Sequence, residues 1–480
     1  MKMEEVEEGV VAIITNHSWL DNPTFKGMRK SLAETFDRIY VFDLHGNAKK
    51  KERTPDGGKD ENIFDIEQGV AISLLLKRSG VERGVWHADL WGERISKYKA
   101  AAQATLDSVQ WEQLAPGAPD WLFKQQDAAL ASIYREFWSV PAILARLGDP
   151  APGIVTTHDE FAVSFTREET KKKIHALLAT KDEQEARQLF RLCSQSQWSY
   201  QRAKVELRKI DLDRIAVDIT YRPFDKRWTI WDRNVAVHRR ERVMNAMLKG
   251  NLALLTARPN RSPDQDQFFV SDRPSETKAA ESTIQSYCFP LWISAGVENL
   301  AADFRAFLDG RYEHHYRPEE IFGYIYAVLH APSYRTRYAE FLRGDFPRIP
   351  FAEDADDFET LSALGWAVVQ AHLLHEVPRS GLADFHGRGD RTVDAVRYSP
   401  AEEAVWINKT QNFAPVPDSV WEFHIGGYQV LNKYLKARKG RVLALDEINH
   451  VSAVADSLAF TIEQMAKIDT AYWSAFPDSG

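Results

Sequence analysis

The densest group of chemically active side chains is a short basic and aromatic stretch, Thr220–Arg242, in a chain of 480 residues whose net charge is −8. Residues 221–261 carry ten Lys and Arg side chains but three carboxylates, a local excess of seven positive charges. Such cations neutralise phosphates, Arg can also read a guanine edge, and Tyr221, Trp228 and Trp231 offer faces for stacking. The stretch therefore predicts a nucleic-acid-binding surface. A β-hairpin with core aromatics and a solvated rim of cations fits the same alternation.

Composition limits the class of protein. The length suggests roughly two to four domains of about 150 residues. Apolar residues at 44% exclude a mainly disordered chain, and no apolar run approaches the ~18 residues that span a bilayer. Cys193 and Cys288 are far apart and lack a metal-ligand spacing, so we expect neither a disulfide scaffold nor a zinc site, and a reducing, cytoplasmic setting.

Alternating strand and helix signals open the chain and predict an α/β sheet. Apolar segments near 9–16, 38–44 and 70–76 have strand character, and 25–36 has helical spacing. Three strands are few beside the usual five or six, so we expect this sheet to be incomplete. Completion by later segments of the same chain is the alternative.

A loop at Leu44–Asn62 separates the second and third of these strands. It is rich in Gly, Pro and Lys, which predicts an exposed, mobile and basic segment. Its lysines that we expect to contact nucleic acid are Lys49, Lys50, Lys51 and Lys59.

The rest of the chain changes character twice. Residues 81–215 predict a helical region, with helices around 93–105, 125–137, 167–192 and 200–208. Strand-like segments then dominate residues 216–300, and apolar i, i+3, i+4 spacing makes 301–480 mainly helical.

Motifs for catalysis or cofactor binding are not evident. Neither GxGxxG nor GxxxxGK[ST] occurs, and the Gly-Gly-Lys at 57–59 follows a long loop instead of a strand. The histidine pairs at 314–315 and at 372 and 375 lack the Glu of HExxH or a third ligand. The sequence predicts no catalytic, cofactor-binding or metal-binding residue in this chain.

Five long segments stand out in a fixed order along the chain. They are GVVAIITNHSWLDNPTFKGMRKSL, then DLHGNAKKK with PDGGKDENIFDIEQGVAI, then YRPFDKRWTIW, IFGYIYAVLHAPSYRTRYAEFLRGDFPRIPF and WEFHIGGYQVLNKYLKARKGR. Together they resemble the C-terminal half of the large type ISP restriction–modification enzymes and of related adenine-N6 DNA methyltransferases.

The resemblance implies an α/β plus α+β fold in four parts. Residues 1–80 would be the last strands of an incomplete Rossmann-like methyltransferase sheet, and 81–215 a helical bridging region. Residues 216–300 would be the mixed-β part of a target-recognition domain, and 301–480 its mainly helical part.

The resemblance also implies S-adenosylmethionine as the methyl donor of the completed enzyme and an adenine swung out of the duplex. Phe64, in ENIF, matches the family segment whose aromatic residue stacks on the extruded base; a hydrophobic residue entering a buried strand is the alternative. The family's donor-binding and catalytic motifs lie upstream of the matched segments, and Asn22–Phe25 does not replace them. We therefore expect no methyl transfer by this chain alone.

The leading hypothesis is sequence-specific recognition of double-stranded DNA, as the specificity part of an adenine-N6 methyltransferase or a type ISP enzyme of phage defence. An N-terminal methyltransferase half or subunit would be its partner, with no membrane. A catalytically inactive scaffold that docks on such a partner through its incomplete sheet is the alternative, and an unrecognised nucleotide or metal site is a third. Besides the loop lysines, the residues expected at DNA are Arg222, Lys226, Arg227, Arg239, Arg240, Arg242, Arg258, Arg261, Arg335, Arg337 and Arg343.

Overall fold

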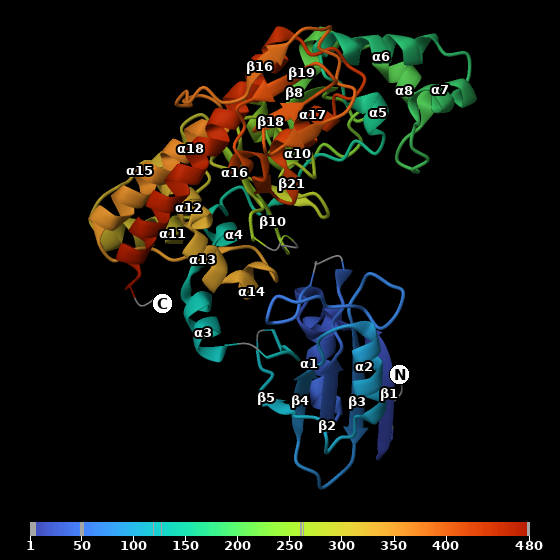
Figure 1. Ribbon diagram of the computed structural model, residues 1–480, viewed down its shortest axis with the longest axis vertical. Helices are drawn as coiled ribbons and strands as arrows, with labels where there is room; N and C mark the ends of the chain where they lie inside the picture. The colour runs from blue at the N-terminus through green and yellow to red at the C-terminus, as the bar shows by residue number, and fades with distance from the viewer. Residues whose placement is uncertain are drawn as a thin grey trace. The chain divides into compact units, whose positions relative to one another are not determined.

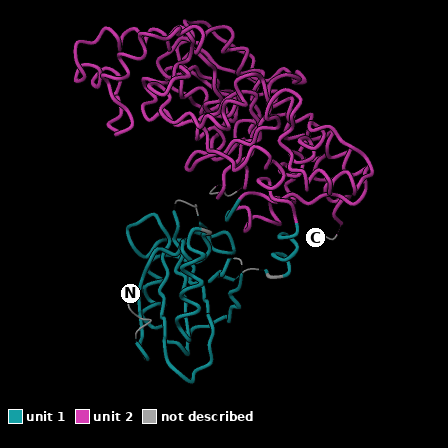
Figure 2. The backbone as a smooth tube through the Cα atoms, turned by 180° about the vertical axis from the view of Figure 1, so that it is seen from behind, with its two compact units in different colours: residues 1–136, 343–345 teal, residues 137–342, 346–480 magenta. Residues whose placement is uncertain are grey.

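The computed structural model describes residues 6–48, 52–118, 120–125, 127–259, 262 and 264–477. The backbone divides into two compact units (Figure 2): Met1–Glu136 with Arg343–Asp345, and Phe137–Leu342 with Phe346–Gly480. The chain combines helices with several small sheets, which confirms the mixed α and β class expected from the sequence. Among the described residues, no helix is both long and apolar enough to cross a membrane.

A five-stranded sheet forms the centre of the first unit (Figure 1), in the order β1-β3-β2-β4-β5. Strand β3 is antiparallel to β1 and β2, β2 is parallel to β4, and β5 is antiparallel to β4. As far as the structure describes the chain, β1 is an edge strand that pairs with β3 alone. The strands are β1 (Gly9–Asn16), β2 (Arg38–Asp43), β3 (Val70–Lys77), β4 (Gly84–Asp89) and β5 (Glu112–Leu114).

Strand β4 differs from the expectation that the chain becomes helical after residue 80. Val85 and His87 are buried on this strand, which lies along β2. The strand has six residues, so its alternation is a weak local signal, and pairing with β2 determines its conformation. The first unit consequently extends to residue 136.

The segment from Trp19 to Phe36, which includes α1, packs on this sheet. Trp19, Phe36 and Phe123 contribute to a buried cluster with Ile39 and Val41 of β2. The helices are α1 (Lys26–Thr35), α2 (Arg94–Gln103) and α3 (Ala128–Glu136), preceded by 3₁₀ turns at His17–Leu20 and Pro23–Phe25.

Small antiparallel sheets organise the second unit. One four-stranded sheet has the order β11-β10-β12-β7, another has the order β16-β19-β18-β17, and four further strand pairs accompany them. The strands are β6 (Trp138–Ser139), β7 (Ala151–Pro152), β8 (Ala216–Arg222), β9 (Asp225–Ile230), β10 (Ala253–Ala257), β11 (Phe268–Ser271), β12 (Ser286–Pro290), β13 (Trp292–Ser294), β14 (Val297–Glu298), β15 (Arg348–Ile349), β16 (Asp384–Gly387), β17 (Arg397–Ser399), β18 (Ala404–Trp406), β19 (Gln411–Ala414), β20 (His424–Ile425) and β21 (Tyr428–Gln429).

Three long helices of the second unit, α12, α15 and α18, lie side by side (Figure 1). The helices of this unit are α4 (Val140–Ile143), α5 (Asp159–Ala162), α6 (Arg167–Ala179), α7 (Glu183–Phe190), α8 (Tyr200–Leu207), α9 (Leu212–Ile215), α10 (Glu241–Met244), α11 (Ala302–Tyr312), α12 (Pro318–His330), α13 (Pro332–Arg337), α14 (Ala339–Leu342), α15 (Ala355–His372), α16 (Asp418–Trp421), α17 (Val430–Lys436) and α18 (Leu445–Ala475), with a 3₁₀ helix at Asn245–Lys249.

The single helix expected at 167–192 is two helices, α6 and α7. Asp182 separates them, because its carboxylate accepts a hydrogen bond from the backbone N–H of Glu185 and so caps the start of α7. The break coincides with the polar run at 180–185, and the capping pattern of Asp182 with Glu185 was the local signal for it.

Candidate nucleic-acid interface

The basic and aromatic stretch begins on the β8–β9 hairpin. Arg222 pairs with Asp225 across a two-residue turn, in which Phe224 has a positive φ of 57°. Ile219 and Phe224 pack into the large core of the second unit. Because successive strand residues face opposite sides, Asp225, Arg227 and Thr229 of β9 turn inward, whereas Lys226 is exposed.

Arg222 is held inside the fold. Its side chain is 11% exposed and pairs with the Glu276 carboxylate. The guanidinium carbon lies 3.8 Å from the centroid of the Tyr221 ring. Burial disfavours the charged form of Arg222, but the charge of Glu276 raises the pKa of this guanidinium overall. Arg222 therefore ties the end of β8 to Glu276 inside the fold.

Arg227 belongs to a buried charge network. Its Nε and Nη2 donate to the two oxygens of Asp225 at 3.0 and 2.7 Å, and Arg438 Nη2 donates to Asp225 Oδ1 at 3.2 Å. The Phe165 ring lies 3.5 Å from the Arg227 guanidinium and 3.8 Å from that of Arg441. The network joins β9 to segments far away in the sequence.

The aromatic residues of the stretch also pack internally. Tyr221 is half-buried against the core formed by α5–α8, and its hydroxyl donates to Asp159 Oδ2 at 3.0 Å. Trp231 packs against the larger core. Tyr221 and Trp231 thus pack against the core, as in the alternative interpretation of the stretch as a β-hairpin with core aromatics.

The C-terminal part of the stretch contains both enclosed and exposed guanidinium groups. Arg239 is 18% exposed, pairs with Glu241 and donates to the Trp231 carbonyl at 2.9 Å. Arg242 is exposed, with Nη1 donating to the Leu147 carbonyl at 2.5 Å. Arg240, immediately before α10, is exposed and has a positive φ of 52°. Arg240 therefore presents its charge at the surface.

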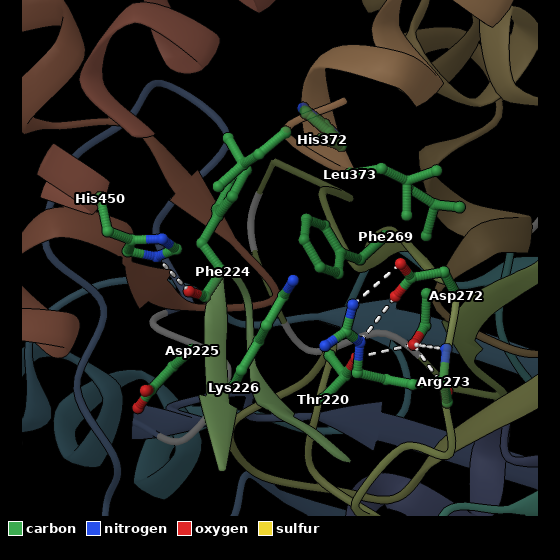
Figure 3. Close-up of a pocket in the computed structure, with 13 residues that line it drawn as sticks. Thr220, Phe224, Asp225, Lys226, Phe269, Asp272, Arg273, His372, Leu373 and His450 are labelled. Atoms are coloured by element: carbon green, nitrogen blue, oxygen red, sulfur yellow. Dashed lines mark hydrogen bonds and ion pairs between the residues drawn. The ribbon is translucent and has the colours of Figure 1, made fainter. Parts of the chain in front are cut away.

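A small cavity lies beside the hairpin (Figure 3). Its volume is about 30 Å³, and Phe224, Lys226, Phe269 and Arg273 are among its lining residues. Lys226 extends from β9 toward Phe269, and desolvation together with the charge of Arg273 lowers its pKa. Sites for small organic ligands have about 300–1,000 Å³. The cavity has room for water but not for a nucleobase.

The remaining predicted contacts in the second half of the chain are dispersed. Arg258 is exposed, with its guanidinium 5.9 Å from the Phe346 ring centroid, and Arg343 is exposed as well. Arg335 is buried, donates from Nε to the Leu329 carbonyl at 2.6 Å, and has a pKa lowered by burial. Arg337 is half-buried. Residue 261, the other predicted arginine of this region, lies outside the described residues.

The loop expected to be exposed between β2 and β3 is buried at both ends. Leu44, His45 and Asn62 are buried, whereas Lys59 is exposed and pairs with Glu61 at 2.5 Å. Leu44 packs with Ile63 and Val70, His45 Nε2 lies 2.7 Å from Asp89 Oδ1, and Asn62 Nδ2 donates to the Gly46 carbonyl at 3.1 Å. The predicted contacts Lys49, Lys50 and Lys51 lie outside the described residues.

Phe64 lies in this same connection and not in a strand. It is 39% exposed, and its backbone N–H donates to Asn62 Oδ1 at 2.8 Å. Arg94 Nη2 donates to its carbonyl at 3.1 Å. The backbone is thus fixed on both sides of an exposed aromatic ring.

Sequence reasoning missed a group of polar residues at the ends of the first unit's strands. His17, Asp43, His45, His87 and Asp89 lie close together there. The available signal was the position of His17, Asp43 and His45 directly at strand ends, but β4, which carries the other two, was not predicted.

Several solved structures have a fold similar to that of this chain. A structure described as a DrdV–DNA complex covers 97% of this chain and is matched over 50% of its own, with 20% identity and a TM-score of 0.73. A nuclease-deletion mutant of the Type ISP restriction–modification enzyme LlaGI, in complex with a DNA substrate mimic, matches 97% of this chain and 46% of its own length. The identity is 18% and the TM-score is 0.69. The ATP-dependent Type ISP restriction–modification enzyme LlaBIII, bound to DNA, matches 97% of this chain and 33% of its own length. The identity is 17% and the TM-score is 0.70. The chain thus shares the fold of part of each of these proteins and spans half or less of their length.

The family is defined by the sequence of the second unit. The model of the Type ISP C-terminal specificity domain matches residues 149–466. This match covers more than half of the chain, so the chain belongs to that family, as the resemblance in its sequence predicted. No curated protein matches the sequence.

Proposed function

We propose that the chain recognises a specific sequence of duplex DNA as the target-recognition part of a restriction–modification enzyme. The match of residues 149–466 to a specificity-domain family carries the proposal. Solved structures of similar fold are described as DNA complexes, which supports the same class of partner.

Surface cations supply the electrostatic part of this function. Lys226, Arg240, Arg242, Arg258 and Arg343 are exposed and suit phosphate contacts, which position a duplex without reading its bases. Arg222, Arg227, Arg239 and Arg335 bind partners within the fold, so their proposed role is to hold the surface residues in place. Lys49, Lys50, Lys51, Lys59, Arg261 and Arg337 remain proposed contacts.

The test is the salt dependence of binding to duplex DNA, measured by fluorescence anisotropy. We expect the logarithm of the binding constant to fall linearly with the logarithm of salt concentration, since bound cations release counterions. Arg240→Ala should make the slope shallower by about 0.9, and Arg240→Lys should keep it. Arg208→Ala, at an exposed arginine outside the predicted set, is the matched control. No binding at about 50 mM salt would contradict the proposal.

We also propose that the first unit is the last part of a Rossmann-like methyltransferase sheet that uses S-adenosylmethionine. Its edge strand β1 supports this, because Val10, Ile13 and Ile14 are 66%, 46% and 50% exposed on a strand paired on one side. Such an edge suits an additional strand. A methyltransferase half, carried by another segment or chain, would pair there, complete the donor and catalytic sites, and act in the cytoplasm.

Docking at β1 is testable with paired substitutions. Ile14→Lys should abolish capture of a chain that carries the donor-binding and catalytic motifs, because a charge would enter the new strand interface. Ile95→Lys, at a residue of α2 that is 68% exposed, should leave capture unchanged. Equal capture by both variants would contradict docking at β1.

Methyl transfer from labelled S-adenosylmethionine separates the two functional hypotheses. In the proposed enzyme, adding the partner produces sequence-dependent methylation, while this chain alone is inactive. Phe64→Ala should then lower the rate, and Phe64→Tyr should retain it, because Phe64 is proposed to stack on the extruded adenine. A complex without methylation or sequence preference would favour the inactive scaffold.

A further inference from the structure

A polar cluster occupies one end of the first unit's sheet. Asp43 ends β2 and Asp89 ends β4, and the two residues are paired in register on these parallel strands. His87 precedes Asp89 by two positions and therefore faces the same side of β4. Three groups with metal-binding chemistry thus converge at the carboxyl ends of neighbouring strands.

The separations between Asp43, His87 and Asp89 suit a bound ion. One ligand atom from each lies within 4.8 Å of the others, and His87 Nε2 is 3.7 Å from Asp89 Oδ1. An ion held at about 2.0–2.2 Å by imidazole and carboxylate groups keeps its ligand atoms roughly 3–4 Å apart. Small side-chain movements are sufficient to close this arrangement around a cation.

His87 provides an independent indication of a ligand. The residue is 2% exposed, and its Nε2 is buried without a hydrogen-bond partner. A buried nitrogen that lacks a partner costs free energy, whereas metal coordination would use its lone pair. The carboxylate of Asp89 lies 3.7 Å from this nitrogen, which is too far for a hydrogen bond.

Hydrogen bonds from outside the trio orient the two carboxylates. His17 Nδ1 lies 2.8 Å from Asp43 Oδ1, and the His45 backbone N–H donates to the same oxygen at 3.0 Å. His45 Nε2 lies 2.7 Å from Asp89 Oδ1. Metal-binding carboxylates are characteristically held by such outer hydrogen bonds. The nitrogens His17 Nδ1 and His45 Nε2 are thereby occupied, whereas His87 Nε2 is available.

Carboxylates are concentrated beside the site. Oxygens of Asp43, Glu52 and Asp89 lie 3.8, 3.2 and 2.7 Å from ring nitrogens of His45. Buried carboxylates are stabilised by paired cations or by bound metal ions, so this grouping suits a cation.

We propose that Asp43, His87 and Asp89 bind a divalent first-row transition-metal ion. A mixed imidazole and carboxylate set suits ions such as Zn²⁺, Mn²⁺ and Fe²⁺. Asp89 has a side chain that is 36% exposed, so solvent or an anionic group can reach the fourth position from its side. The ion would link the ends of β2 and β4. Because His45 contacts both Asp89 and Glu52, it would also stabilise the start of the loop that leads to Phe64.

Titration of the full chain with Co²⁺, after dialysis against a chelator, tests the site. We expect visible d–d absorption that saturates at one ion per chain. His87→Ala and Asp89→Asn should each weaken binding at least tenfold, while His315→Ala, at an exposed histidine of the second unit, should not change it. Far-UV circular dichroism would monitor folding, and Asp89→Asn is the informative variant if His87→Ala unfolds.

Two results would overturn the proposal. One is the lack of saturable Co²⁺ absorption in the folded wild-type chain. The other is unchanged stoichiometry and affinity in the folded Asp89→Asn variant, which would place any bound ion elsewhere.

Discussion

At the scale of single residues, the guanidinium groups around the β8–β9 hairpin divide by burial. Arg222 and Arg227 pair with carboxylates inside the fold, whereas Arg240 stands at the surface. Alternation in the sequence predicted the hairpin, but both of its faces carry charges and rings, so the pattern could not decide which face is inward. The partners that decide it, Glu276 and Arg438, are remote in sequence.

Asp225 is the residue on which this buried network depends. Asp225→Asn keeps the shape of the side chain but removes the charge that compensates Arg227 and Arg438, whose side chains are 7% and 5% exposed. We expect a loss of about 3–5 kcal/mol in the free energy of unfolding, measured with urea, because the buried guanidinium of Arg227 loses its paired carboxylate and Arg438 keeps only Glu447. Asp213→Asn removes an exposed partner of Lys171 and should have little effect. Equal losses in both variants would contradict the network.

At the scale of elements, the three long helices of the second unit show what periodicity does and does not predict. Apolar spacing identified α12 and α15 as helices. It did not show how closely they pack, because this depends on two glycines at their crossing. A Cβ on Gly365 would lie 2.0 Å from the Gly323 carbonyl oxygen, and one on Gly323 would lie 2.4 Å from the Ser362 carbonyl oxygen.

Gly365→Ala should therefore force α12 and α15 apart. We expect a loss of about 1–3 kcal/mol or more in unfolding free energy, since the clash is with backbone and cannot be relieved by a rotamer change. Gly310→Ala on α11 is the control: nothing lies within 4 Å of its Cβ, and replacing a helical glycine should stabilise by about 0.5–1 kcal/mol. Stabilisation by both substitutions would show that the helices are not in close contact.

At the scale of the whole molecule, average properties and local ones diverge. The net charge of −8 argues against a nucleic-acid partner, while exposed cations near the hairpin argue for one. Local strand signals located β1, β2 and β3, but the remainder of their sheet depends on β4 and β5, which tertiary pairing forms. The cluster at Asp43, His87 and Asp89 was hidden for the same reason, since it exists only when β2 and β4 are neighbours.

Buried histidines give the second unit a defined response to acid. Burial lowers the pKa of His158, His330, His372 and His450, for His372 to about 3. In the unfolded chain these rings take up protons near pH 6.5. The unfolded state therefore binds more protons than the folded state below that pH. Their contribution to stability is complete above about pH 6.5 and is lost as the pH falls.

His372 allows this linkage to be measured. Its Nδ1 lies 2.7 Å from the Tyr326 hydroxyl and its Nε2 3.0 Å from Thr461 Oγ1, so it is enclosed as a neutral ring. Each such histidine removes up to about 1.4 kcal/mol of unfolding free energy for each pH unit below 6.5. His372→Gln should lower stability at neutral pH but flatten its pH dependence between about pH 6.5 and 5 by this amount, as followed by urea denaturation. His315→Gln, at a side chain that is 69% exposed, is the control, and a slope that is equally steep in both variants would show that His372 does not remain neutral in the folded state.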